Sequence, residues 1–113
     1  MIARNARTGA VLAGRMARAA TFGARLLGLL GKSALAEGEA LLIEPCASVH
    51  TWFMRFPIDV AFLSPELRVL RAVPDLKPWR VRWDRRAGAA LELPAGTLTR
   101  TGTRAGDELT LEV

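Results

Sequence analysis

The chain has 113 residues, of which 50% are hydrophobic and 24% charged, which suits one folded domain and excludes a disordered chain. Its formal net charge is +5, and arginine supplies 14 of the 16 cations, so contact with an anionic surface is one option. One cysteine cannot form an internal disulfide, and no apolar run approaches the roughly 18–20 residues of a membrane span.

The N-terminal part is basic, predicts a small hairpin and one helix, and carries no clear targeting signal. Residues 10–13 and 15–19 have the pattern of two short strands. Thr21 is a suitable N-cap for a helix over residues 22–30, whose leucines recur at helical spacing, and Gly31 is a suitable left-handed stop. Because no unbroken apolar stretch here is long enough for a secretory signal, we expect a cytoplasmic protein.

The remainder of the chain predicts short strands separated by glycine and proline turns. We expect strands at residues 40–43, 58–63, 68–73, 79–83, 89–93 and 108–113. A turn at residues 64–66 joins two of them as a hairpin, and residues 95–101 form a helical turn closed by Gly102. The predicted fold is mainly β, a compact sandwich or barrel-like arrangement of antiparallel sheets with one main N-terminal helix.

Residues 45–59 contain the only cysteine and the only histidine of the chain, Cys46 and His50, which are four positions apart. The pair could be half of a metal site, with Glu44 or Asp59 or a second copy of the chain supplying further ligands, or it could act as a nucleophile and its base. Zinc needs three or four ligands and no oxyanion donors can be identified, so no metal or cofactor and no confident catalytic residue is expected.

The same stretch could instead form the wall of a small-ligand pocket, or simply pack in the core. The predicted ligand-binding residues are His50, Trp52, Met54, Arg55 and Asp59, with Phe53 as a further wall. In the packing alternative, Cys46 is a small buried hydrophobe and the aromatic residues are core. Arg55 and Asp59 would then form an ion pair that fixes the turn into the next strand, although Arg55 could instead hold an anionic ligand.

A second candidate surface lies at residues 77–86, where arginines alternate with tryptophans. Arg80 and Arg82 are candidate anion contacts on one strand face, and the strand period places Trp79 and Trp83 on the opposite face. Exposed tryptophans could stack on nucleic-acid bases. Because we expect the tryptophan face to be the inner one, nucleic acid is not the expected partner.

Blocks of residues spread over nearly the whole chain from about Arg7 carry a family resemblance. They are Gly28-Leu29-Leu30-Gly31, Cys46, Val49-His50-Thr51, Met54-Arg55-Phe56-Pro57-Ile58-Asp59-Val60, Phe62-Leu63, Pro78-Trp79-Arg80, Leu91-Glu92-Leu93-Pro94-Ala95-Gly96 and Gly106-Asp107. The chain thereby resembles the domain of unknown function 192 family of small bacterial and archaeal domains. The resemblance implies a single β-dominated domain with one main helix, spanning residues 1–113, and no assigned activity or cofactor.

From these observations we expect a non-enzymatic ligand-binding or accessory module with a pocket around residues 46–59, which takes a small ligand or a protein partner. Two alternatives stay open. One is an enzyme that uses Cys46 and His50, with or without a metal, and the other is a basic domain that contacts nucleic acid through Arg80 and Arg82.

Overall fold

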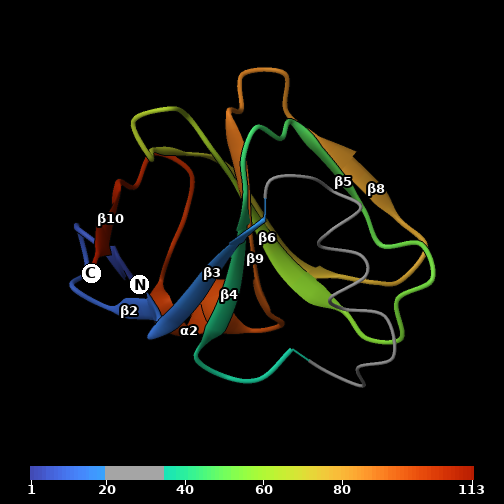
Figure 1. Ribbon diagram of the computed structural model, residues 1–113, viewed down its shortest axis with the longest axis horizontal. Helices are drawn as coiled ribbons and strands as arrows, with labels where there is room; N and C mark the ends of the chain where they lie inside the picture. The colour runs from blue at the N-terminus through green and yellow to red at the C-terminus, as the bar shows by residue number, and fades with distance from the viewer. Residues whose placement is uncertain (20–34) are drawn as a thin grey trace.

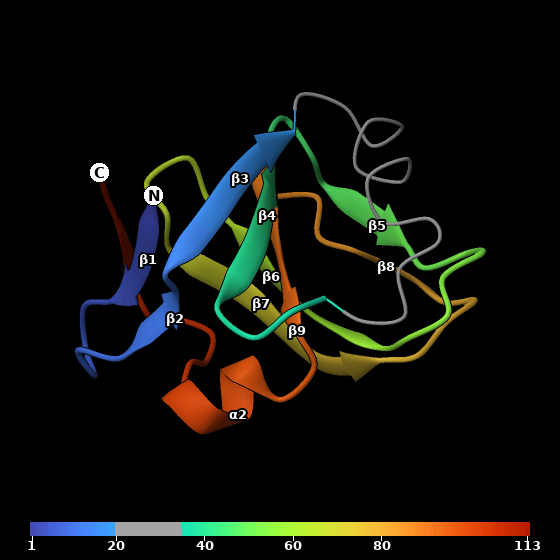
Figure 2. The same ribbon diagram turned by 60° about the horizontal axis from the view of Figure 1, so that its bottom comes forward.

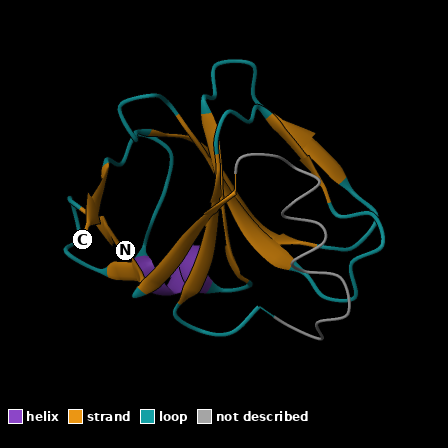
Figure 3. Ribbon diagram, viewed as in Figure 1, coloured by secondary structure: helices purple, strands orange, loops and turns teal. Residues whose placement is uncertain are grey.

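A computed structural model of the chain describes residues 1–19 and 35–113, and in this part the strands form three sheets (Figures 1 and 3). The central sheet has the order β3 (Arg15–Ala19), β4 (Glu39–Ile43), β9 (Ala89–Pro94), β6 (Ile58–Leu63) and β7 (Val69–Leu76). A second sheet has the order β10 (Leu109–Glu112), β1 (Ile2–Asn5) and β2 (Val11–Ala13). The third is a ribbon of two strands, β5 (Ser48–His50) and β8 (Val81–Trp83). The mainly β fold is confirmed; the central sheet is open, with β3 and β7 at its edges, and the arrangement is compatible with a sandwich.

The neighbouring strands β9 and β6 are buried on both faces, so the central sheet separates two cores. On one side, Ala61, Leu63 and Leu91 join a cluster that reaches the β10-β1-β2 sheet. On the other side, Ile58, Val60 and Phe62 alternate with the first set and join the cluster that includes Val49 of the β5–β8 ribbon, hereafter the ribbon core. The ribbon is therefore fastened to the sheet by its inward side chains.

The predicted N-terminal hairpin is wrong, although both of its strands exist. Strand β2 pairs with β1, whereas β3 leaves that sheet and pairs in parallel with β4. Only Gly14 separates β2 from β3. Because the common hairpin loops need at least two residues, the chain cannot fold back here and turns into the next sheet instead. The predicted helix at residues 22–30 lies outside the described residues.

The other predicted strands are confirmed, with small changes of length. Leu67 N–H donates to the Ser64 carbonyl in the predicted turn between β6 and β7. The helical turn before Gly102 is helix α2 (Thr97–Thr101), which lies beneath the sheets in Figure 2. Gly102 ends it at φ 66°, in the left-handed region that glycine adopts without strain.

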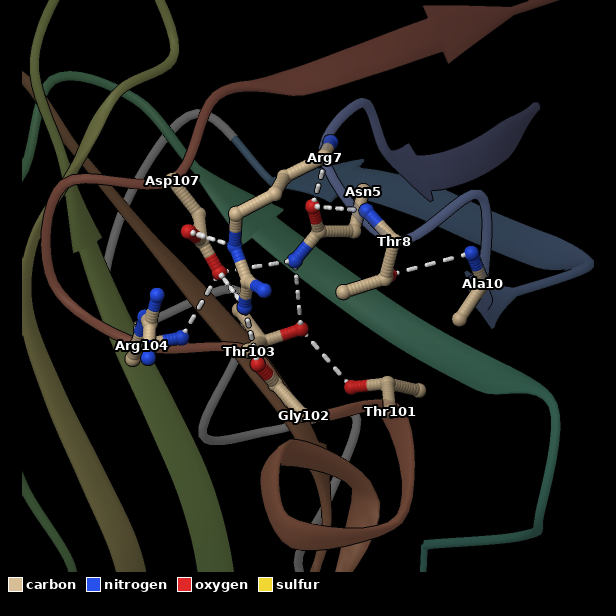
Figure 4. A network of polar contacts seen from close by, with 9 residues as sticks. All are labelled: Asn5, Arg7, Thr8, Ala10, Thr101, Gly102, Thr103, Arg104 and Asp107. Carbon is tan, nitrogen blue, oxygen red and sulfur yellow. Dashed lines mark hydrogen bonds and ion pairs between the residues drawn. The ribbon is translucent and has the colours of Figure 1, made fainter.

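The two ends of the chain are tied together by strand pairing and by a buried polar network (Figure 4). The Arg7 guanidinium donates to Asp107 Oδ1 at 2.7 Å and to Oδ2 at 3.0 Å, and Asn5 Nδ2 donates to Asp107 Oδ2 at 2.9 Å. The hydrogen bonds from Arg7 and Asn5 hold the pKa of Asp107 well below its usual range. Each oxygen of this carboxylate is engaged, so the network joins the β1–β2 turn to the loop before β10.

Candidate functional site

The β5–β8 ribbon turns its tryptophan side to solvent, which reverses the prediction that Trp79 and Trp83 face the core. Across the ribbon, Val49 pairs with Arg82, and Val49 is buried in the ribbon core. The neighbouring position on β8, Trp83, therefore points away from the core. The strand period is confirmed for Val81–Trp83, but the assignment of its inner face was wrong, because Val49, the cross-strand partner of Arg82, packs into the ribbon core.

Five large apolar side chains gather on and beside this ribbon, and we call them the aromatic surface. Their exposed fractions are 46% for Trp52, 62% for Phe53, 57% for Trp79, 42% for Val81 and 56% for Trp83. The other large apolar side chains that the structure shows as exposed are Met1, Val11 and Val113, which belong to the region of the β10-β1-β2 sheet. Exposure of this kind is therefore concentrated on the ribbon and its loops.

The rings of the aromatic surface also contact each other, and two of them sit on strained backbone. The rings of Phe53 and Trp79 meet at a centroid distance of 4.9 Å, and those of His50 and Trp52 stack at 4.5 Å. Phe53 has φ 67° and Trp79 has φ 64°. A bulky residue at positive φ costs about 1–3 kcal/mol, and such strain persists only where the surroundings impose it.

Thr51 is the residue that imposes this geometry; in the sequence it stands only within the family block Val49-His50-Thr51, with no sign of this role. Its side chain is fully buried; the hydroxyl donates to the Lys77 carbonyl at 2.6 Å and accepts from Arg80 N–H at 2.9 Å. Its backbone carbonyl accepts from the N–H groups of Trp79 and Met54. Thr51 thus joins the loop after β5 to the loop before β8, and so places Trp52 and Phe53 beside Trp79.

The border of the aromatic surface is basic, and several of its arginines have no carboxylate partner among the described residues. Arg80 donates to the carbonyls of Pro78 and Trp79, and Arg82 to that of Val81. The arginines of this border that no described ion pair engages are Arg55, Arg71, Arg80, Arg82 and Arg85.

The two acids of the border are already neutralised. Asp75 bonds Lys77 at 2.6 Å, and Asp84 bonds Arg86 at 2.7 Å. The Arg86 guanidinium and backbone N–H lower the pKa of Asp84 to about 2. Asp84 is therefore ionised at neutral pH, and each of the two carboxylates has a cationic partner, so the guanidinium groups outside the described ion pairs give the border its positive charge.

Cys46 and His50 lie at the two ends of the same short segment, and each bonds to the backbone close to itself. The Cys46 thiol, half-buried against the ribbon core, donates to the Ser48 carbonyl at 3.0 Å. His50 Nδ1 accepts from Trp52 N–H at 3.3 Å. Among the described contacts, none joins the sulfur to the imidazole. Residues 1–19 and 35–113 contain no cluster of three or more histidine, cysteine and carboxylate side chains.

Arg55 and Asp59 do not form the predicted ion pair. Asp59 is fully buried and accepts three backbone N–H bonds, from Asp75 at 2.8 Å, Gly96 at 3.2 Å and Leu98 at 2.8 Å. Gly96 is the N-cap of α2 and has no side chain to cap the helix, so the distant Asp59 does it instead. Arg55 is exposed, which leaves its guanidinium to the border of the aromatic surface.

Met54 is buried in the ribbon core, together with Phe56, so the packing alternative is right for these two residues and wrong for Trp52 and Phe53. A pocket of about 330 Å³ lies elsewhere, lined by Leu35, Glu37, Pro94, Ala95, Gly96, Thr97 and Arg100. A pocket at residues 46–59 stays a prediction.

Comparisons with known proteins identify a family and a fold. The sequence model of a family described as DUF192, uncharacterized ACR, matches residues 3–111. Two crystal structures share the fold: a protein of unknown function from Novosphingobium aromaticivorans (TM-score 0.82, 21% identity, covering 98% of this chain and 84% of that one) and a candidate transcription regulator from Sinorhizobium meliloti (TM-score 0.78, 20% identity, 96% and 89%). A search of curated proteins found no match. Within the described residues, no helix is both long and apolar enough to cross a bilayer.

Proposed function

The chain belongs to the DUF192 family, and membership of this family does not imply an activity. We propose that the chain is a non-enzymatic binding module whose contact surface is the aromatic surface of the β5–β8 ribbon. The observation that carries the proposal is the exposure of Trp52, Phe53, Trp79, Val81 and Trp83 on one part of the molecule. Contiguous exposed apolar side chains with a polar border are typical of interaction sites.

The rigidity of the surface supports the same function. Thr51 holds the two loops together, and Phe53 and Trp79 remain at positive φ although smaller residues would fit these turns with less strain. A surface fixed in advance loses little conformational freedom when a partner binds. In this proposal His50, Trp52 and Arg55 contribute to binding and Met54 supports the surface from the ribbon core, while Asp59 holds the start of α2 and the end of β7.

The enzyme alternative, based on Cys46 and His50, stays a prediction. The contacts described for the Cys46 thiol and for His50 Nδ1 connect each to its own loop backbone and make no nucleophile–base pair.

The proposed function can be tested without knowing the partner, because all three tryptophans of the chain lie on the aromatic surface and the chain has no tyrosine. Intrinsic fluorescence thus reports on this surface alone. We expect a saturable change in emission with at least one of four probes: a single-stranded oligonucleotide, anionic lipid vesicles, a neutral oligosaccharide or polyglutamate. No change with any of them would overturn the proposal.

A stability measurement separates a binding role of the tryptophans from a packing role. We expect Trp83→Ala to change the free energy of unfolding by less than about 1 kcal/mol, because more than half of the side chain is in solvent. Phe62→Ala is the matched control: Phe62 is fully buried, and its loss should cost about 3–5 kcal/mol. An equal loss in both variants would mean that Trp83 is a packing residue.

A further inference from the structure

Building on the proposed function, we propose that the partner of the aromatic surface is a single-stranded nucleic acid, whose bases stack on the exposed rings and whose phosphates contact the arginines of the border. The inference rests on three features: the positive charge of the border, the row of exposed apolar side chains that it flanks, and the exposure of the surface.

The positive charge of the border favours an anionic partner. Residues 74–88 carry five cations and two acids, a net charge of +3, and both acids are already bound to Lys77 and Arg86. Guanidinium groups that have no carboxylate partner bind phosphate oxygens well, because their planar donors match them. A neutral sugar fits less well: the chain has no glutamine or tyrosine, and its one asparagine, Asn5, lies in the network between the chain ends.

Apolar side chains and arginines alternate in the sequence of residues 79–83, and within β8 they lie on opposite sides of the strand. The order is Trp79-Arg80-Val81-Arg82-Trp83. Side chains two positions apart on a strand are about 6–7 Å apart, so Val81 and Trp83 form a row. Each nucleotide brings one apolar base face and one negative charge, so a base can stack on this row while its phosphate contacts the arginines of the border.

The apolar side chains of the surface are exposed along and beside β8, which favours a polymer over a small molecule. Trp83 lies at one end of β8, and the touching pair of Phe53 and Trp79 lies at the other end, beside the stacked His50 and Trp52. A duplex hides the faces of its bases, whereas a single strand offers them. The tryptophan side of the ribbon therefore fits single strands better than duplexes.

The experiment titrates fluorescein-labelled oligothymidylate, oligouridylate and a duplex of equal length with the full chain, using fluorescence anisotropy at low salt and then at rising salt. We expect both single strands to bind more tightly than the duplex. Trp79→Ala/Trp83→Ala should weaken binding on the order of 10-fold or more for each ring that stacks. Comparison of oligothymidylate with oligouridylate shows whether DNA or RNA is preferred.

Two double variants separate the border from charge in general. Arg80→Ala/Arg82→Ala should weaken binding and reduce the slope of log K against log salt by about 1.4, since two phosphate contacts are lost. Arg100→Ala/Arg104→Ala removes the same charge from the region of α2 and should leave the affinity within about 2-fold once the general loss of charge is allowed for.

The possible outcomes distinguish this inference from the function on which it rests. The nucleic-acid inference would be overturned if neither single strand bound at low salt. It would also be overturned if Trp79→Ala/Trp83→Ala bound as tightly as the unaltered chain. A tryptophan emission change with anionic vesicles or polyglutamate alone would do the same and leave the binding module standing. If no probe changed the tryptophan emission, both the nucleic-acid inference and the proposed binding function would be overturned.

Discussion

Replacing Asp59 with alanine removes the acceptor of three backbone N–H groups from two separate segments of the chain. Oδ1 accepts from Asp75 and Gly96, and Oδ2 accepts from Leu98. A hydrogen bond to a charged group contributes about 1.5–3 kcal/mol net, and a buried donor left without a partner costs about 1–3 kcal/mol. Because part of that loss is recovered when the loop relaxes toward water, we expect Asp59→Ala to lower the free energy of unfolding by about 3–5 kcal/mol.

Asp59→Asn gives a sharper version of the same prediction. The amide keeps one oxygen, so in its better orientation it retains the bonds from Asp75 and Gly96 but points an NH₂ group at Leu98 N–H. The loss should therefore be smaller than for alanine, about 1.5–3 kcal/mol. Amide hydrogen exchange should become faster at Leu98 before it does in β9, because the start of α2 loses its cap.

The assay is urea denaturation followed by far-ultraviolet circular dichroism, with Asp75→Asn as the control. Asp75 has an exposed side chain paired only with Lys77, and asparagine tolerates its φ of 50°, so the control should lose less than about 1 kcal/mol. If Asp59→Ala also lost less than about 1 kcal/mol, the view that Asp59 caps α2 and holds β7 would be refuted.

Two further predictions concern the other ionisable residues. Hydrogen bonds from Arg7 hold the pKa of Asp107 in the folded protein far below its unfolded value, which is near 4. The stability that this carboxylate contributes is therefore fully present above about pH 4 and is lost as the pH falls toward the folded pKa. Acid unfolding of Asp107→Asn, compared with that of the unaltered chain, should depend less on pH below about 4, and an unchanged profile would contradict the assignment. Alkylation of the Cys46 thiol should be slow at neutral pH because the sulfur is half-buried and donates to Ser48; rapid alkylation well below pH 8 would instead favour the enzyme alternative.

The buried strands of the central sheet could be read from the sequence because their pattern is local. Residues 58–63 and 89–93 are nearly continuous apolar runs bounded by proline or glycine, and they are β6 and β9. Gly102 as the end of a helical turn was equally local, since it depends on one residue's freedom at positive φ. The blocks of the family were also sufficient to identify it.

The pairing of β3 was not predictable in this way. Its weak alternation showed a strand, but its partner β4 lies beyond residues 20–34 and pairs with it in parallel. The acceptor role of Asp59 was not predictable either. In the sequence its expected partner was Arg55, four residues away, whereas the fold brings the N–H groups of Asp75, Gly96 and Leu98 to it. Partners far apart in the chain leave no local pattern.

For the aromatic surface too, one property was predictable from the local sequence and another was not. The alternation in the sequence determined by itself that Val81 and Trp83 share one side of β8 and Arg82 lies on the other, whereas Trp79 precedes the strand at φ 64°. Only the tertiary structure decided which side is outside: Val49, paired with Arg82, packs into the ribbon core, and the tryptophans are left in solvent. A period of two fixes which side chains lie together, but the inner face is set by what packs against the strand, and that comes from elsewhere in the chain.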